Sequence, residues 1–159
     1  WLAGRGVTGL DSSRVAMLIA VTERLAGVRL HDHDVYAATV GGMRSSDPGS
    51  DLAICLAIAS AAWGTPLPAE VAAIGEVSLS GDIRRVAMTG QRVAEAVRAG
   101  HRRVLVPVGT KETVPLGRSA QYVVEVATLR QAVDALRVRR AAQDGSAASN
   151  RGDGRGAEH

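Results

Sequence analysis

The chain of 159 residues has few of the side chains that stack on bases, form disulfides or supply an amine. Aromatic residues make up 3% of it, with no Phe, which argues against a single-strand nucleic-acid binder that stacks bases on aromatic rings. The one cysteine, Cys55, excludes an internal disulfide and a cysteine-rich zinc site. The one lysine, Lys111, confines lysine-dependent chemistry to a single position.

Long apolar runs are also missing. The longest run, from Leu52 to Trp63, is interrupted by Ser60 and falls short of the roughly 20 residues that a membrane helix needs. The first residues lack the apolar core of a signal peptide. Hydrophobic residues make up 46% of the chain and charged residues 22%, which is typical of one globular domain with tails. We therefore expect no membrane association and a cytoplasmic location.

The positive charge is unevenly distributed. The net charge is +3, of which residues 137–159 carry +2, from five Arg against three acidic residues. The rest of the chain is thus nearly neutral in net charge. It nevertheless contains a cluster of arginines in which Glu95 is the sole acidic residue. Arginine binds phosphate in a bidentate manner, so this cluster predicts contact with a duplex backbone. The alternative is a solvated helix face whose Arg stems cover apolar surface. The cluster consists of Arg84, Arg85, Arg92, Arg98, Arg102 and Arg103.

Periodicity and turn residues predict a mixed α/β or α+β sandwich at 9–137. Residues 1–8 are expected to form a linker because of their glycines, and residues 138–159 a disordered tail. Helices are expected at 12–25 between Asp11 and Gly27, at 51–63, at 91–99 with Thr89 as cap, and from Thr128 to about 137. Strands are expected at 34–40, 71–79, 83–86, 104–108 and 122–126, with a hairpin turn at 80–82 and a loop at 109–118.

Several candidate chemistries can be weighed from single motifs. The segment around Lys111, LVPVGTKE, lacks the first Gly and the final Ser/Thr of a phosphate-binding P-loop. The run from His31 to Asp34 has metal-ligand residue types, but a polar turn is the simpler interpretation. Cys55 lies on an apolar helix and is expected to be a buried hydrophobe. Ser50 stands at a helix start, where an oxyanion is stabilised, and is either a nucleophile or an N-cap like Asp47.

Four motifs in order resemble a known family. They are DVYAATVGGMR (34–44), DPGSDLAICLAIAS (47–60), GEVSLSGDIRRV (75–86) and GQRVAEAVRAGHRRVLVP (90–107). Together they are similar to the Lon-protease-like domain at the C-terminus of the RadA (Sms) family of bacterial DNA-repair proteins. With the flanking helices, the resemblance covers about residues 9–137. It implies a Lon-protease-like fold, of the ribosomal S5 domain 2-like type.

The resemblance also implies a peptidase fold that lacks the catalytic residues of a peptidase. Lon-type peptidases use a Ser–Lys dyad, and here the serine position falls on Gly49 and the lysine position on Gln91. Glutamine is neither a base nor an amine nucleophile. Asp51 would place a carboxylate near any oxyanion. The basic turn departs from the family, because Arg85 stands where Pro is usual and Thr89 where Arg is usual.

By this resemblance, the parent protein is an ATP-driven branch-migration motor acting in recombinational repair. Its zinc-binding and RecA-like ATPase domains would lie upstream, with their ATP, Mg and Zn, and this segment is expected to need no cofactor or metal. The implied partners are duplex or branched DNA, copies of itself in a hexameric ring, and a recombinase. The alternative is an active peptidase using Ser50 and Lys111.

Overall fold

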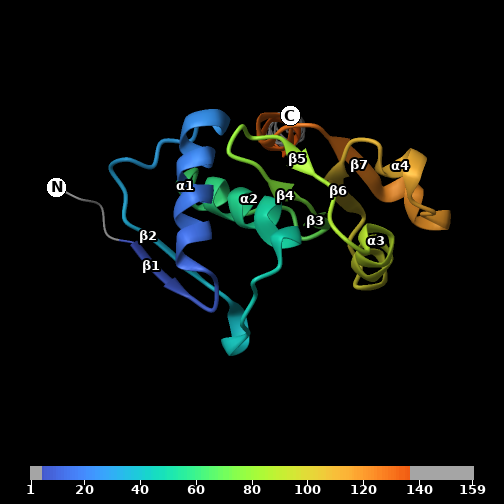
Figure 1. Cartoon of the computed structure of the whole chain (residues 1–159), viewed down its shortest axis with the longest axis horizontal. Helices are drawn as coiled ribbons and strands as arrows, with labels where there is room; N and C mark the ends of the chain where they lie inside the picture. Colours follow the sequence, from blue (N-terminus) through green and yellow to red (C-terminus); the bar gives the residue numbers. More distant parts are fainter. Residues whose placement is uncertain (1–4, 137–159) are drawn as a thin grey trace, which may run out of the picture.

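The structure is a computed structural model that describes residues 5–136 (Figure 1). The expected tail at 138–159 lies outside the described residues. The helices are α1 (Ser12–Ala26), α2 (Asp51–Ala62), α3 (Thr89–Arg98) and α4 (Thr110–Thr113), followed by a last helix described over 129–136. The strands are β1 (Arg5–Thr8), β2 (Val35–Ala38), β3 (Val71–Ala73), β4 (Glu76–Val77), β5 (Ile83–Arg84), β6 (Arg103–Pro107) and β7 (Val123–Val126). Short 3₁₀ turns are η1 (Val40–Gly42), η2 (Pro48–Ser50) and η3 (Gly117–Tyr122).

A parallel sheet in the order β3–β6–β7 separates two cores. Side chains alternate between the two faces of a strand. In β6, Leu105 therefore faces the main core with α1, α2 and the last helix, whereas Val104 and Val106 face a smaller core with α3. All three are fully buried, as expected for a parallel strand covered on both faces. The fold is mixed α/β, which confirms the predicted class.

Residues 5–8 form a strand, which corrects their prediction as part of a linker. This strand, β1, pairs in parallel with β2, and Gly6 lies opposite Tyr36. A Cβ atom at Gly6 would come within 2.6 Å of the Tyr36 ring, so the ring packs directly on the glycine backbone. Glycine near the chain start suggested flexibility, but pairing with a strand far along the chain orders the segment.

The single strand predicted at 71–79 is two strands in different sheets. The break lies at Gly75, whose N–H donates to the Gly49 carbonyl at 3.0 Å. A Cβ at Gly75 would come within 2.6 Å of Ile83 Cγ2, so only glycine permits this close approach. The chain then enters the β4–β5 hairpin, whose predicted turn is confirmed, with Gly81 at φ +83°.

The helix boundaries follow local capping in two cases and depart from it in one. Asp11 accepts a hydrogen bond from the Arg14 N–H, and Gly27 ends α1 at φ +67°, as predicted. Thr128 also caps the last helix as predicted, accepting from the Gln131 N–H at 3.2 Å. Thr89 is not the cap of α3 but its first residue, and its hydroxyl donates to the Val86 carbonyl. No helix within residues 5–136 is long and apolar enough to span a membrane.

Candidate functional site

The loop before α2 is where the family resemblance places peptidase chemistry. Asp47 begins it, and its Oδ1 accepts from the Gly49 N–H at 2.9 Å. The Gly49 carbonyl accepts from Gly75 and the Gly75 carbonyl accepts from the Leu52 N–H, at 3.0 and 3.1 Å. The loop, which includes the short turn η2, is therefore anchored to the junction of β3 and β4, and Gly49 is buried.

Arg92 covers Gly49 at this loop. Its Nη1 forms an ion pair with Asp47 Oδ2, and its Nε donates to the Ala87 carbonyl at 2.9 Å. A Cβ atom on Gly49 would lie 2.9 Å from Arg92 Nη1 and 3.1 Å from Asp47 Oδ1. The Arg92 guanidinium also holds the pKa of Asp47 below its usual value. A side chain at this position would therefore contact the Arg92 guanidinium and the Asp47 carboxylate.

Gln91, the second position of the expected degenerate dyad, is not among the side chains nearest to Gly49. The side chain nearest to Gly49 on α3 is that of Arg92, not that of Gln91. Gln91 is exposed and lines a separate open hollow with Arg85 and Met88. Met88 precedes α3 with φ +60°, an unusual conformation for a residue other than glycine.

Ser50 and Lys111, the residues of the alternative peptidase, are also apart. The Ser50 hydroxyl donates to the Asp47 carbonyl at 2.7 Å, and it does not cap α2. Lys111 is exposed on α4, where its backbone N–H donates to Glu125 Oε1. Figure 1 shows α4 at the right-hand edge of the molecule, beyond β6 and β7, whereas α2 lies in the middle. No hydrogen bond or ion pair within the described residues joins the two side chains.

A buried ion pair beside the loop was not foreseen from sequence. The Asp51 carboxylate is completely buried and paired with Arg14, whose Nε donates to Oδ1 at 2.7 Å. The same carboxylate accepts from the Val77 N–H at 3.0 Å, and Arg14 also contacts Glu76. These carboxylates raise the pKa of the Arg14 guanidinium. One signal was available, since Arg14 precedes the buried Leu18 by four residues and so lies on the apolar face of α1.

The six arginines proposed for DNA contact have different surroundings. The Arg84 side chain is exposed and makes no hydrogen bond or ion pair with the described residues, and Arg85 donates to Thr113 Oγ1 at 2.6 Å. Arg98 pairs with Glu95 on the surface. Arg103 donates to the Ala135 carbonyl at 2.8 Å and is half-buried. The cluster therefore contains two kinds of arginine. Arg92 and Arg103 join separate parts of the fold, whereas Arg84, Arg85 and Arg98 lie on the surface.

Arg102 adds an aromatic contact that the sequence did not indicate. Its guanidinium lies 5.1 Å from the centre of the Tyr122 ring, within the range of a cation–π interaction. Its Nη1 also donates to the Val97 carbonyl at the end of α3. Arg102 and Arg98 therefore form one surface group at the C-terminal end of α3, whereas Arg84 and Arg85 precede its N-terminal end.

The histidine-containing segment forms the predicted turn. The His33 N–H donates to the Leu30 carbonyl at 3.1 Å, which closes it. The two ring nitrogens of His31 lie 3.2 Å from Glu23 Oε1 and 3.1 Å from Asp32 Oδ1. Within residues 5–136, no group of three His, Cys, Asp or Glu side chains is placed to hold a metal ion.

Cys55 is buried in α2, as predicted, and we expect its thiol to be unreactive in the native state. Burial raises the pKa of this thiol to about 12, so the reactive thiolate is scarce near neutral pH. Ellman's reagent should react on the order of 100-fold more slowly with the native chain than with the urea-unfolded chain. Equal rates in the two states would contradict the buried position of Cys55.

Fold and site together define a mixed α/β domain with surface arginines at both ends of one helix and no assembled Ser–Lys pair among its described residues. Residues 40–110 match the family model described as subunit ChlI of Mg-chelatase. The chain is 43% identical over 133 residues to the DNA repair protein RadA of Mycolicibacterium smegmatis, covering 84% of this chain and 28% of that protein. It is 38% identical over 134 residues to the RadA of Haemophilus influenzae, with 84% and 28% covered.

The chain is therefore a RadA-related segment, which confirms the resemblance noted in its motifs. A third relative, the RadA of Mycobacterium tuberculosis, is 42% identical over 136 residues. That match covers 79% of this chain and 28% of the relative. The chain thus spans little more than a quarter of the length of these curated relatives.

Proposed function

We propose that this segment is a non-catalytic, Lon-protease-like domain of a RadA-type DNA-repair protein. In this role it binds the backbone of duplex or branched DNA and supports assembly of a hexameric ring during recombinational repair and branch migration. The observation that carries the proposal is the loop at Gly49, where a glycine stands at the serine position and the Arg92–Asp47 ion pair lies directly beside it. A domain retained without a nucleophile is best explained by binding and assembly.

The non-catalytic role predicts no turnover of unfolded protein. Ser50 lacks a base, because Lys111 belongs to α4, and the Ser50 hydroxyl is bonded to the Asp47 carbonyl. We expect incubation with a fluorescently labelled unfolded casein to give no release above that of buffer, for both the native chain and Ser50→Ala. Turnover that is lost in Ser50→Ala would instead establish the peptidase.

The placement of the surface arginines supports binding to a phosphate backbone. Arg84 and Arg85 precede α3, and Arg98 and Arg102 lie at its other end. A helix of ten residues is about 15 Å long at 1.5 Å per residue, close to the roughly 12 Å width of the major groove. Arginines that flank a helix of this length on both sides suit contact with phosphates on either side of a groove, without base contacts.

DNA binding should weaken steeply with salt, and the arginines before α3 should carry part of that dependence. We expect Arg84→Ala with Arg85→Ala to reduce the slope of log K against log salt by about 1.8, because each phosphate contact contributes about 0.9. Fluorescence anisotropy with a labelled duplex measures this slope. The titrations are run between about 50 and 200 mM salt, because affinities that depend on phosphate contacts change strongly over this range.

A control removes the same charge elsewhere. Arg24 and Arg29 are exposed near the end of α1, and their side chains make no hydrogen bond or ion pair with the described residues. Arg24→Ala with Arg29→Ala should leave the slope nearly unchanged. Equal loss in both double variants would show that net charge alone drives binding. No loss in the Arg84 and Arg85 variant would contradict the assignment.

The remaining features of the proposal concern the parent protein. ATP, Mg and Zn would bind to its other domains, a recombinase would be a further partner, and the location would be cytoplasmic. Ring assembly requires head-to-tail contacts between different surfaces of neighbouring copies. Sedimentation velocity of the full-length parent, with and without this domain, tests that contribution, since loss of the domain should shift hexamers to smaller species.

A further inference from the structure

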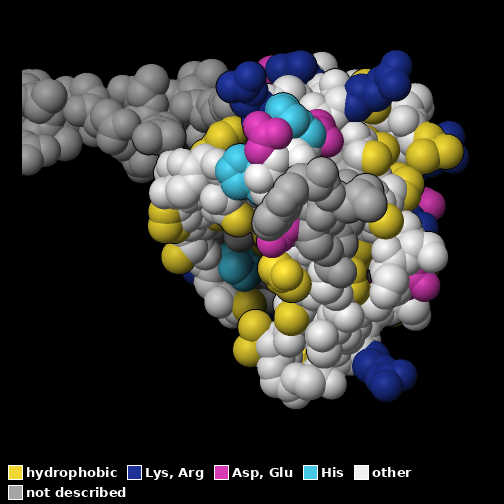
Figure 2. All heavy atoms as spheres, turned by 90° about the vertical axis from the view of Figure 1, so that its left-hand side faces the viewer, with side chains coloured by type: hydrophobic (Ala, Val, Ile, Leu, Met, Phe, Trp, Pro, Cys, Tyr) yellow, Lys and Arg dark blue, Asp and Glu magenta, His cyan; other side chains and the backbone are white. Residues whose placement is uncertain are grey.

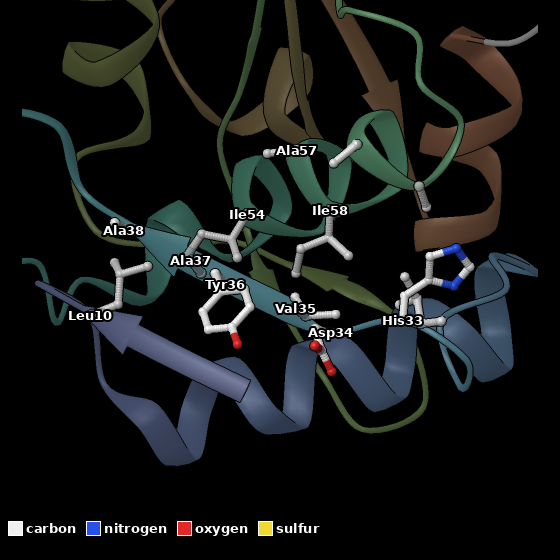
Figure 3. A pocket seen from close by; sticks show the side chains of 13 residues that line it. Leu10, His33, Asp34, Val35, Tyr36, Ala37, Ala38, Ile54, Ala57 and Ile58 are labelled. Atoms are coloured by element: carbon white, nitrogen blue, oxygen red, sulfur yellow. The ribbon is translucent and has the colours of Figure 1, made fainter. Parts of the chain in front are cut away.

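An apolar groove of about 510 Å³ runs between β2 and α2. Figure 3 shows Ile54 and Ile58 extending from α2 toward β2, with the Tyr36 ring on the β2 side and His33 at one end. Leu10, which follows β1, lines the groove near its other end. The groove therefore lies beside the N-terminal strand, far from the arginines of α3.

The helix that forms one wall of this groove lacks a polar face. Its sequence, DLAICLAIASAA, has one charged residue, Asp51, and that carboxylate is buried against Arg14. Ala53, Ala57 and Ala61 are exposed at a spacing of four residues, so they share one side of the helix. A helix that faces water on one side normally carries charged residues there. The outer side of α2 is thus suited to contact with protein.

The strand that forms the other wall has an open edge. In a parallel pair, alternate backbone groups point away from the partner, and no further strand within residues 5–136 pairs with β2. The edge of β2, VYAA, contains neither the proline nor the charged residues that protect an exposed edge. Tyr36 on this strand is 74% exposed. A parallel sheet of two short strands is rarely stable without further cover.

Hydrophobic side chains also reach the surface around this part of the molecule. Figure 2 views the side that carries β1, β2 and α1, where yellow side chains are scattered over much of the surface. Basic, acidic and histidine side chains gather mainly toward the top of the same view. Val40 and Met43, which follow β2, are among the large hydrophobic residues that are most exposed.

We infer that an extended segment of the same RadA-type polypeptide, from outside these 159 residues, binds in this groove as an added strand beside β2. The inference rests on the proposed function in so far as it assumes the longer parent. The relatives have 72% of their length outside the matched segment, since 28% is covered, so ample chain is available. A covalently linked strand is present at high effective concentration, which favours it over a second copy. Its side chains would alternate between apolar residues facing α2 and polar residues facing water.

Hydrogen exchange of the backbone amides tests this occupant directly. The full-length chain that contains this segment is compared with the 159-residue chain, both at low and at high concentration. We expect the Val35–Ala38 peptide to exchange at least tenfold more slowly in the full-length chain, independently of concentration. Equal exchange in the two chains would overturn the inference. Protection that appears in the short chain as its concentration rises would also overturn it, because a second copy would then be the occupant.

A charge in the groove provides a second, independent test. Ala57→Glu should remove the added protection of β2 in the full-length chain, yet leave the short chain folded because Ala57 is exposed there. Ala20→Glu on the outer side of α1 is the matched control and should change neither chain. If Ala57→Glu leaves protection intact, the groove is not the binding site. Failure of the chain to bind DNA would contradict the proposed function but not the added strand. Unchanged hydrogen exchange of β2 would contradict the added strand but not DNA binding, so the two failures are distinguishable.

Discussion

Replacing Arg14 with methionine is expected to lower the free energy of unfolding by about 3–5 kcal/mol, because the substitution leaves an uncompensated charge in the interior. The Asp51 carboxylate is completely buried, and Arg14 supplies both of its side-chain hydrogen bonds. The Val77 N–H is the remaining donor. Urea denaturation followed by circular dichroism measures the loss.

Two further variants separate the ion pair from other effects. Arg24→Met changes an exposed arginine on the same helix and should stay within about 0.5 kcal/mol of the native chain. Arg14→Met combined with Asp51→Leu removes both charges and should recover part of the loss, because a buried pair is often replaceable by apolar residues. A small loss in Arg14→Met alone would contradict the stabilising role assigned to the pairing of Arg14 with Asp51.

Truncating Leu105 to alanine is expected to cost about 2–5 kcal/mol, through lost burial and the cavity that remains. Leu105 is fully buried at the centre of the middle strand β6, where its carbonyl also accepts from the Ile74 N–H at 2.9 Å. For a chain of this size the midpoint of thermal unfolding should fall by about 2–4 °C for each kcal/mol.

Val108→Ala is the matched control for this truncation. Val108 lies just beyond the same strand and is 51% exposed, so its truncation creates no internal cavity. We expect a change within about 0.5 kcal/mol for the control. Similar losses in both variants would show that Leu105 does not occupy the main core. Differential scanning calorimetry of the three proteins, compared side by side, decides the point.

Sequence patterns predicted the features that depend on neighbours in the chain. Asp11 and Gly27 delimit α1 as predicted, and Thr128 caps the last helix. The mixed α/β class follows from the same periodicities. Strand β1 was missed because its four residues have no strong local preference, and their pairing partner β2 follows the whole of α1.

The candidate site, like the fold, was predicted from the sequence only where residue identity was sufficient. Gly49 was identified from the resemblance, but the residue that covers it was not. Arg92 was grouped with the arginines predicted to contact DNA because only its charge is visible in the sequence. Its partner Asp47 lies 45 residues away, so the ion pair depends on how α3 packs against the loop.

By itself the sequence determined the caps of α1 and of the last helix, the α/β class, the family resemblance and the absence of a serine at Gly49, because local conformational preference and residue identity suffice for these. Tertiary structure alone decided which arginines face water, that Asp51 is paired with Arg14, and that β2 and α2 leave an apolar groove. These features join residues far apart in the chain, and their energies come from desolvation and packing, which exist only once the elements are brought together.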